Sequence, residues 1–215
     1  MTAKLLAEGL GTGFLLIGVV GSGIMAENLA SGNVAITLLA NAIATGCMLY
    51  VLITTLGPVS GAHFNPAVTL AFALRGDIAP RQAVQYVIVQ VSGGLLGVWA
   101  THGMFDQDIW QMSTTMHRTG PAQWASEVIA TFGLLLVIFG GLKARSEAVP
   151  SLVALYITGA YWYTSSTSFA NPAVTIARGF SDSFAGIYPG HIAMFIVMQI
   201  IAVGLAALVL PKLFR

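Results

Sequence analysis

The tripeptide Asn-Pro-Ala occurs twice in this chain, and both copies continue into Val-Thr; they stand at Asn65-Pro66-Ala67 and Asn171-Pro172-Ala173. The side-chain oxygen of an Asn that precedes a helix accepts hydrogen bonds from free backbone N–H groups, and Pro at the first helical position gives up no hydrogen bond. Each copy therefore predicts a helix start. The two side-chain amide nitrogens remain available as hydrogen-bond donors to a small molecule.

The composition places the chain in a membrane. Of its 215 residues, 56% are hydrophobic and only 8% are charged, and the mean hydropathy of +0.82 lies outside the range of soluble domains. About 20 apolar residues are needed to cross about 30 Å of hydrocarbon as a helix. Six spans are predicted, at about residues 5–25, 34–56, 83–103, 124–142, 149–163 and 192–210. The runs 66–74 and 172–180 are too short to cross, so we expect half-helices that enter the membrane and stop.

A helix that starts inside a membrane needs a cavity built by the protein, because lipid cannot satisfy the free N–H groups of its first turn. One such start falls in each half of the chain. Three spans per half is an odd number, so the second half must be inverted, and the two half-helices should meet near the midplane from opposite faces. The sequence thus predicts an all-α membrane protein with one domain over residues 1–215 and inverted repeats at about 1–105 and 120–215.

The positions of the basic residues orient the chain. If the amino terminus is inside, only Arg118 and Arg178 fall outside, whereas the cytoplasmic side receives Lys4, Arg75, Arg81, Lys143, Arg145, Lys212 and Arg215. Positively charged residues are enriched on the cytoplasmic side of membrane proteins. We therefore expect both termini to be cytoplasmic, as an even number of spans requires.

The segment Ser-Gly-Ala-His-Phe-Asn-Pro-Ala at residues 60–67, with the second motif half a chain later, resembles the major intrinsic protein family of aquaporins and aquaglyceroporins. The resemblance covers essentially the whole chain. It implies six spans and two half-helices around a pore, in a homotetramer whose protomers each carry their own pore. The amides of Asn65 and Asn171 would point into that pore while their carbonyl oxygens cap the half-helices. The helix starts would add a positive potential that repels cations.

Matched polar residues in the two halves have two interpretations. Glu8 corresponds to Glu127, and Gln90 corresponds to Gln199. Intramembrane carboxylates can form a proton relay in a coupled transporter. The resemblance implies instead that each Glu accepts hydrogen bonds from its re-entrant loop, and the symmetric placement favours this structural role, with the two Gln bracing the same loops. His63, beside the first motif, is expected at the cytoplasmic entrance of the pore.

The chain departs from the family at the selectivity constriction. Most members carry Arg directly after the second Asn-Pro-Ala, and Val174 stands there in this chain. Spacing from the two motifs places Thr45, Gly159 and Ser168 at the other three constriction positions. These four residues are small and uncharged, so we expect a wide, neutral opening. The Thr and the Val resemble a bacterial branch of the family that is associated with arsenical resistance.

Arg178 is a candidate replacement for the missing guanidinium. It lies one helical turn after Val174, on a similar face, and can reach the pore entrance. The alternative is that Arg178 extends to the membrane interface or pairs with an acid such as Asp182.

We expect a passive channel for water and small uncharged solutes, such as glycerol, urea or arsenous acid. A water-selective channel is an alternative, and a secondary transporter would also show inverted repeats but would depend on an ion gradient. An intramembrane serine protease is disfavoured, because Ser60 and His63 share one short loop with no third group to orient the base. We therefore expect no enzyme.

Few partners are expected besides solutes, water, membrane lipid and other copies of the chain. Cys47 is the single cysteine, which excludes a cysteine-cluster metal site, and the His residues show no metal-ligand spacing. No cofactor or metal is expected. The net charge of +1 gives no reason to expect nucleic acid. The expected location is the inner membrane of a bacterium.

Overall fold

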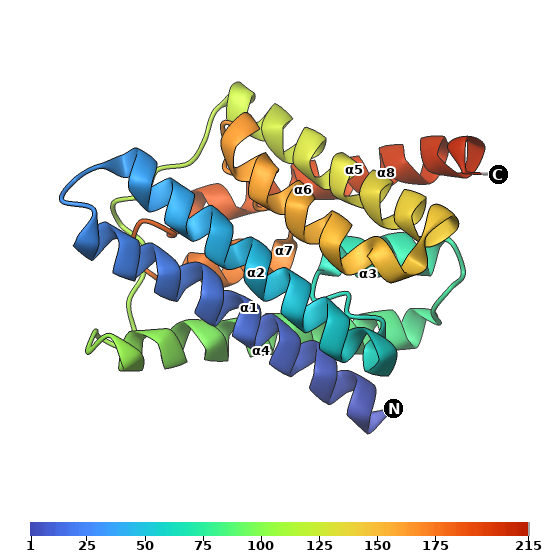
Figure 1. Cartoon of the computed structure of the whole chain (residues 1–215), viewed down its shortest axis with the longest axis horizontal. Helices are drawn as coiled ribbons and strands as arrows, with labels where there is room; N and C mark the ends of the chain where they lie inside the picture. The colour runs from blue at the N-terminus through green and yellow to red at the C-terminus, as the bar shows by residue number, and fades with distance from the viewer. Residues whose placement is uncertain (215) are drawn as a thin grey trace.

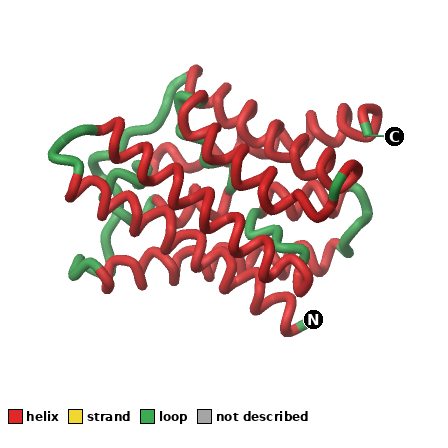
Figure 2. Tube along the Cα trace, viewed as in Figure 1, coloured by secondary structure: helices red, strands yellow, loops and turns green. Residues whose placement is uncertain are grey.

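The computed structural model describes residues 1–214, and every regular element in that range is a helix (Figure 2). The predicted all-α class is therefore confirmed. In chain order the helices are α1 (Thr2–Leu29), α2 (Val34–Ser60), α3 (Pro66–Leu74), α4 (Pro80–Met104), α5 (Pro121–Ala144), the 3-10 helix η1 (Ser146–Ala148), α6 (Val149–Tyr163), α7 (Pro172–Arg178) and α8 (Pro189–Leu213).

Within residues 1–214, five helices have the length and composition to cross a membrane, namely α1, α2, α4, α5 and α8. The sixth predicted span, α6, has 15 residues, which is about 23 Å at 1.5 Å per residue. The directly preceding η1 adds about 6 Å, because a 3-10 helix rises about 2 Å per residue. Together they approach the ~30 Å thickness of the hydrocarbon layer.

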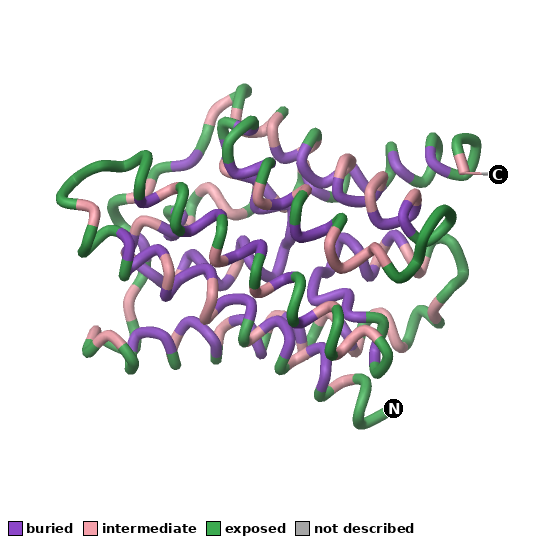
Figure 3. The backbone as a smooth tube through the Cα atoms, in the orientation of Figure 1, coloured by how far each residue is buried: buried purple, intermediate pink, exposed green. Residues whose placement is uncertain are grey.

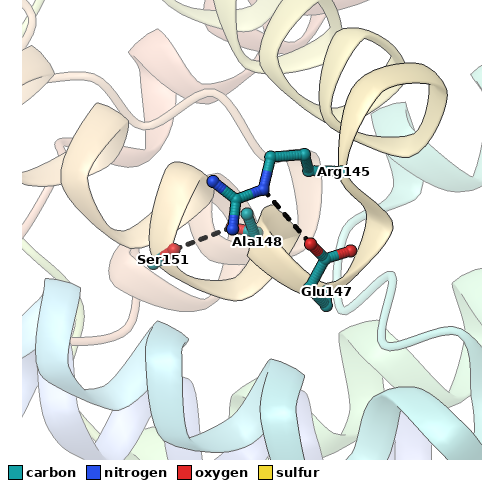
Figure 4. Close-up of polar contacts among 4 residues, drawn as sticks. All are labelled: Arg145, Glu147, Ala148 and Ser151. Atoms are coloured by element: carbon teal, nitrogen blue, oxygen red, sulfur yellow. Dashed lines mark hydrogen bonds and ion pairs between the residues drawn. The ribbon is translucent and has the colours of Figure 1, made fainter.

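The connection from α5 through η1 into α6 holds two local polar contacts (Figure 4). The Nε of Arg145 lies 3.2 Å from the Oε1 of Glu147, and the hydroxyl of Ser151 donates to the carbonyl of Ala148 over 2.8 Å. Both charged side chains are largely exposed, so the ion pair contributes little stability. The turn brings α6 back antiparallel to α5 within a few residues.

The short helices α3 and α7 lie inside the bundle formed by the long ones (Figure 1). Helix α3 packs against α4, α5 and α8, and α7 packs against α1, α4 and α8. The two short helices also contact each other. Two chain segments of nine and seven residues, far apart in sequence, therefore meet at the centre of the molecule.

Both termini lie at the same end of the bundle, together with the α3–α4 loop and the α5–α6 turn (Figure 1). The α1–α2, α4–α5 and α7–α8 connections lie at the opposite end. The end with the termini therefore carries Lys4, Arg75, Arg81, Lys143, Arg145 and Lys212. The remaining basic residue of that predicted group, Arg215, lies outside the described residues.

The bundle buries polar side chains within an apolar core and exposes large apolar side chains on its outside. Buried residues follow the inner sides of the helices (Figure 3), and they include the fully buried Glu8, Gln90, Glu127 and Gln199. Large apolar side chains such as Leu208 are exposed on the outside. Such an apolar surface is suited to lipid.

Glycines set how closely α1 and α4 approach. A Cβ atom on Gly93 would collide with the carbonyl oxygen of Gly9, and one on Gly97 would collide with that of Gly13. Small residues at such a crossing let helix backbones pack directly on each other in a membrane. The close crossing brings Glu8 on α1 next to Gln90 on α4.

Candidate functional site

Asn65 and Asn171 cap the two short helices in the same way. The Oδ1 of Asn65 accepts from the backbone N–H groups of Ala67 and Val68, at 2.8 and 3.4 Å. The Oδ1 of Asn171 accepts from the equivalent groups two and three residues later, at 3.0 and 3.3 Å. Both Asn residues have extended backbone and are followed by Pro at the first helical position, which is the arrangement that the motif predicts.

The amide nitrogens of the same two residues cross between the halves. The Nδ2 of Asn65 donates to the carbonyl of Ala170 over 2.7 Å, and the Nδ2 of Asn171 donates to the carbonyl of Phe64 over 2.8 Å. Ala170 and Phe64 each directly precede the other Asn. One hydrogen of each amide is therefore used to join the loops, and the second hydrogen of each amide is left for another acceptor.

The two re-entrant loops (residues 61–65 and 164–171) hold unusual backbone conformations. Positive φ angles occur at Ala62 and Phe64 in the first loop, and at Thr167, Ser168 and Ala170 in the second. Such angles cost non-glycine residues of the order of 1–3 kcal/mol each and persist only where neighbouring groups hold them.

In the first loop, the carboxylate of Glu8 holds this conformation. It accepts from the backbone N–H groups of His63 and Phe64 at 2.9 and 2.7 Å and from the hydroxyl of Ser60 at 2.7 Å. The Nε2 of Gln90 donates to the same carboxylate over 2.8 Å and to the hydroxyl of Thr69 over 3.0 Å. All the donors around this buried carboxylate belong to the loop or to its supporting helices.

In the second loop, Glu127 occupies the matching place. It accepts from the backbone N–H groups of Phe169 and Ala170, both at 2.9 Å. The Nε2 of Gln199 donates to Glu127 over 2.7 Å and to the hydroxyl of Thr175 over 2.9 Å. Each half of the chain thus holds its loop with a buried Glu, a Gln and a Thr in the same roles.

A central cavity of about 110 Å³ runs between these loops and the long helices. Along α6 its wall includes Val149, Val153, Ile157 and Tyr161, positions one helical turn apart that cover about 18 Å of the bundle axis. Both Asn65 and Asn171 line the cavity. Its wall is otherwise mostly apolar, and a space of this size holds several water molecules.

Three of the four predicted constriction residues line the cavity: Thr45, Ser168 and Val174. The fourth, Gly159, does not. It is exposed on α6, two positions from both Ile157 and Tyr161, and a shift of two residues turns a helical position by about 200°. Spacing from the motif placed Gly159 at the constriction, but the register of α6 turns it to the outside.

Tyr161 takes the place on α6 that Gly159 was expected to hold. It is buried, lines the cavity and shares a 3.2 Å hydrogen bond between its hydroxyl and that of Thr45. The expectation of a wall made only of small residues is therefore corrected. The one-turn spacing of Tyr161 from Ile157 could have identified it in the sequence, but only if the register of α6 were known.

Arg178 also belongs to the cavity wall and is only 1% exposed. Its Nε donates to the carbonyl of Ala185, and its guanidinium carbon lies 3.5 Å from the ring centre of Phe169. It forms no ion pair with Asp182, whose carboxylate instead accepts four hydrogen bonds from Thr114 and Thr115. Of the two interpretations open in the sequence, the geometry favours the one in which Arg178 turns inward.

A second arginine, Arg118, enters this region from the α4–α5 loop (residues 105–120), and the sequence pattern did not single it out. Its Nε donates to Gly186, its Nη2 to Phe184 and its Nη1 to the hydroxyl of Thr167, over 2.8, 2.9 and 3.3 Å. All three nitrogens are therefore occupied. Burial lowers the pKa of Arg118 to about 10, so it stays charged at neutral pH.

At the other end of the cavity, His63 is buried and lines the wall. Its Nδ1 lies 3.1 Å from the hydroxyl of Thr69, and its ring stacks on Phe72 at 4.6 Å between centres. The hydroxyl of Ser60 donates to Glu8 instead of to His63. The two residues therefore do not form the pair that a serine protease requires.

Comparison with known proteins agrees with this arrangement. The sequence profile of the family described as Major intrinsic protein matches residues 1–164. The chain belongs to the major intrinsic protein family. The matched residues include the first Asn-Pro-Ala motif but end before the second.

Individual members of the major intrinsic protein family are similar over longer stretches. The chain is 53% identical to "Aquaglyceroporin AqpS" of Rhizobium meliloti (strain 1021) over 201 residues, covering 94% of this chain and 85% of that protein. It is 37% identical to "Aquaporin NIP1-2" of Arabidopsis thaliana, over 72% of this chain and 54% of the plant protein. Members of this family are channels rather than enzymes, as expected for this chain.

The fold is shared with a solved structure. The X-ray structure of the aquaglyceroporin from Plasmodium falciparum superposes with a TM-score of 0.71 and covers 99% of this chain and 98% of that one. At 17% sequence identity the likeness concerns the fold alone. It confirms the aquaporin-like arrangement of long and short helices.

Proposed function

We propose that this chain forms a passive channel that conducts water and small uncharged solutes through its central cavity. The observation that carries the proposal is the pair of Asn65 and Asn171, whose amides stand in the cavity wall where α3 and α7 meet. A solute oxygen can accept from one amide hydrogen on each Asn, while the apolar side chains that make up most of the wall form no hydrogen bonds with it. Weak, spaced binding of this kind favours passage.

The named residues have distinct roles in this proposal. The pore motifs are Asn65, Pro66, Ala67, Asn171, Pro172 and Ala173, and the constriction is formed by Thr45, Ser168 and Val174, with Tyr161 in place of Gly159. Glu8, Glu127, Gln90 and Gln199 brace the re-entrant loops. His63 lines the inner entrance and Arg178 the outer one.

The solutes proposed are glycerol, urea and neutral metalloids such as arsenous acid, with water. Similarity to the aquaglyceroporin from Rhizobium meliloti supports solutes larger than water, as does the absence of Arg at residue 174. A water-selective channel is the second candidate, and the hydrogen-bonded pair of Thr45 and Tyr161 favours it, because that pair narrows the opening compared with glycine on α6.

We infer a homotetramer with a pore in each protomer, in the inner membrane of a bacterium, and inverted repeats at about 1–105 and 120–215. The matched pairs of Glu8 with Glu127 and Gln90 with Gln199 support the repeats. The basic residues at the end that holds the termini support a cytoplasmic position for both.

Stopped-flow light scattering on proteoliposomes tests the function. We expect rapid shrinkage under an osmotic gradient, followed by re-swelling as glycerol, urea or arsenous acid enters along its own gradient. A protonophore should leave these rates unchanged, because no mobile charge is built into the path. Accumulation of a solute inside the vesicles against its own gradient, abolished by the protonophore, would show that the chain is a coupled transporter.

A further inference from the structure

Within residues 1–214, two buried polar atoms of residues that line the cavity have no hydrogen-bond partner. They are the Nη1 of Arg178 and the Oγ of Ser168, and both residues line the cavity. A buried donor without a partner is costly, and a charged one more so. In a cavity wall, a ligand or solvent molecule can supply the missing hydrogen-bond partner of such a group.

Arg118 shows that the unpaired nitrogen of Arg178 is not a general property of this region. Each of the three guanidinium nitrogens of Arg118 donates to the protein. Both guanidinium groups lie near the ring of Phe169, that of Arg178 at 3.5 Å and that of Arg118 at 5.4 Å from the ring centre. Arg118 therefore uses all three guanidinium nitrogens to hold loops together, whereas the Nη1 of Arg178 can still donate to a solute.

The position of Arg178 in α7 places its guanidinium in the cavity wall. Val174 and Arg178 are one helical turn apart and both line the cavity, about 6 Å from each other along the axis. The bond from Nε to Ala185 and the stacking on Phe169 fix the plane of the guanidinium. A fixed planar cation with a free N–H recognises oxygen acceptors and repels positive charge.

We propose that Arg178 is the specificity-determining residue at the outer end of the cavity. Its Nη1, together with the hydroxyl of Ser168, binds a hydroxyl oxygen of a passing neutral solute, and its charge excludes cations, including hydrated protons. The guanidinium thus acts from one turn further along α7 than residue 174. This inference rests on the proposed channel function and adds to it which residue selects the solute.

Three variants reconstituted in proteoliposomes separate the two parts of this role. Arg178→Leu removes both the charge and the donor fork, and Arg178→Lys keeps the charge but loses the planar fork. The double variant Val174→Arg with Arg178→Leu moves the guanidinium one turn back. Water and glycerol permeabilities are measured by stopped-flow scattering, and proton leak by an enclosed pH-sensitive dye under an imposed potential.

We expect Arg178→Leu to raise the proton leak and to lower the glycerol-to-water permeability ratio, each by about tenfold, as for loss of one charge-assisted hydrogen bond and one fixed charge. Arg178→Lys should lower the ratio without raising the leak. The double variant should suppress the leak again. Leak and ratio within about twofold of wild type in Arg178→Leu would overturn the proposal, since an effect of that size is below one hydrogen bond.

These measurements also distinguish a failed role for Arg178 from a wild-type protein that does not conduct and from a variant that does not fold. A wild-type protein that conducts neither water nor glycerol contradicts the channel function itself and not only the role of Arg178. If Arg178→Leu does not fold, Arg178→Lys decides the matter, because an unchanged glycerol-to-water ratio in that folded variant also overturns the proposal.

Discussion

Asn65 donates from its side-chain amide to the carbonyl that precedes Asn171, and Asn171 donates to the carbonyl that precedes Asn65, over 2.7 and 2.8 Å. This reciprocal pair closes the centre of the bundle. It also shows how one residue type does two tasks, since each side-chain oxygen caps a helix while the nitrogen joins the opposite loop. The second hydrogen of each amide is what a solute can use.

Replacing Asn171 with Leu should block conduction and reduce the amount of folded protein. The change leaves two backbone N–H groups of α7 and the carbonyl of Phe64 without partners in a buried site, at a cost of several kcal/mol. Asn33→Ala is a matched control, because Asn33 caps α2 at an exposed position and its loss should cost about 1 kcal/mol. Folded yield and osmotic shrinkage are measured for both. Normal shrinkage in vesicles with Asn171→Leu would contradict the central position of the motif.

Glu8→Gln should lower the folded yield more than it changes transport per folded molecule. Each oxygen of Glu8 accepts two hydrogen bonds. In Glu8→Gln an amide nitrogen, which cannot accept, replaces one of these oxygens. Each hydrogen bond to the charged group that is lost destabilises the fold by about 1.5–3 kcal/mol. Glu147→Gln is the control, since its ion pair is exposed. A variant that folds normally but transports solute only in a proton-dependent way would argue for a relay.

Part of the structure behind these two predictions follows from the local sequence, and part does not. The caps of α3 and α7 follow from local rules for Asn and Pro, and the apolar runs locate the long helices, so both could be predicted. The position of Gly159 could not, because a constriction residue depends on the rotation of α6, and nothing local in an apolar helix fixes that rotation. Arg118 was missed for a related reason: its partners Gly186 and Phe184 lie far away in the chain.

Acid should loosen the contact between the α4–α5 loop and the α7–α8 loop (residues 179–188). Burial alone would raise the pKa of the Asp182 carboxyl, but hydrogen bonds from Thr114 and Thr115 outweigh it and lower the pKa from 3.8 to about 2. A carboxyl whose pKa is lowered by folding stabilises the fold above its unfolded pKa and loses this effect as the pH falls through the folded value. The contact should therefore be intact at pH 5 and above and weaken between about pH 4 and pH 2.

Asp182→Asn provides the measurement. The difference in thermal unfolding temperature between wild type and variant in detergent should be largest above pH 5 and should shrink as the pH falls toward 2. Thr54→Ala on α2, whose hydroxyl donates to the carbonyl of Tyr50 in the same helix, serves as a pH-independent control. A wild-type advantage that grows on acidification would contradict the role given to Asp182.

Val174→Arg should narrow the cavity and favour water over larger solutes. The new guanidinium would face the wall near Thr45 and Tyr161, one turn from Arg178, and should reduce glycerol permeability relative to water by about tenfold. Val174→Leu adds bulk without charge and should change the ratio less. If Val174→Arg retains the wild-type ratios for glycerol, urea and arsenous acid, residue 174 does not control selection.

Cysteine labelling tests whether solutes pass through the cavity lined by Asn65, Asn171 and Val174. In a background carrying Cys47→Ala, which removes the single native cysteine, Val174→Cys places a thiol in the cavity wall, and Gly159→Cys places one on the exposed face of α6. Glycerol uptake is measured before and after a small methanethiosulfonate reagent, and mass spectrometry reports the extent of labelling. We expect labelled Val174→Cys to lose glycerol uptake and labelled Gly159→Cys to retain it. Full labelling of Val174→Cys with glycerol uptake unchanged would show that solutes do not pass through this cavity.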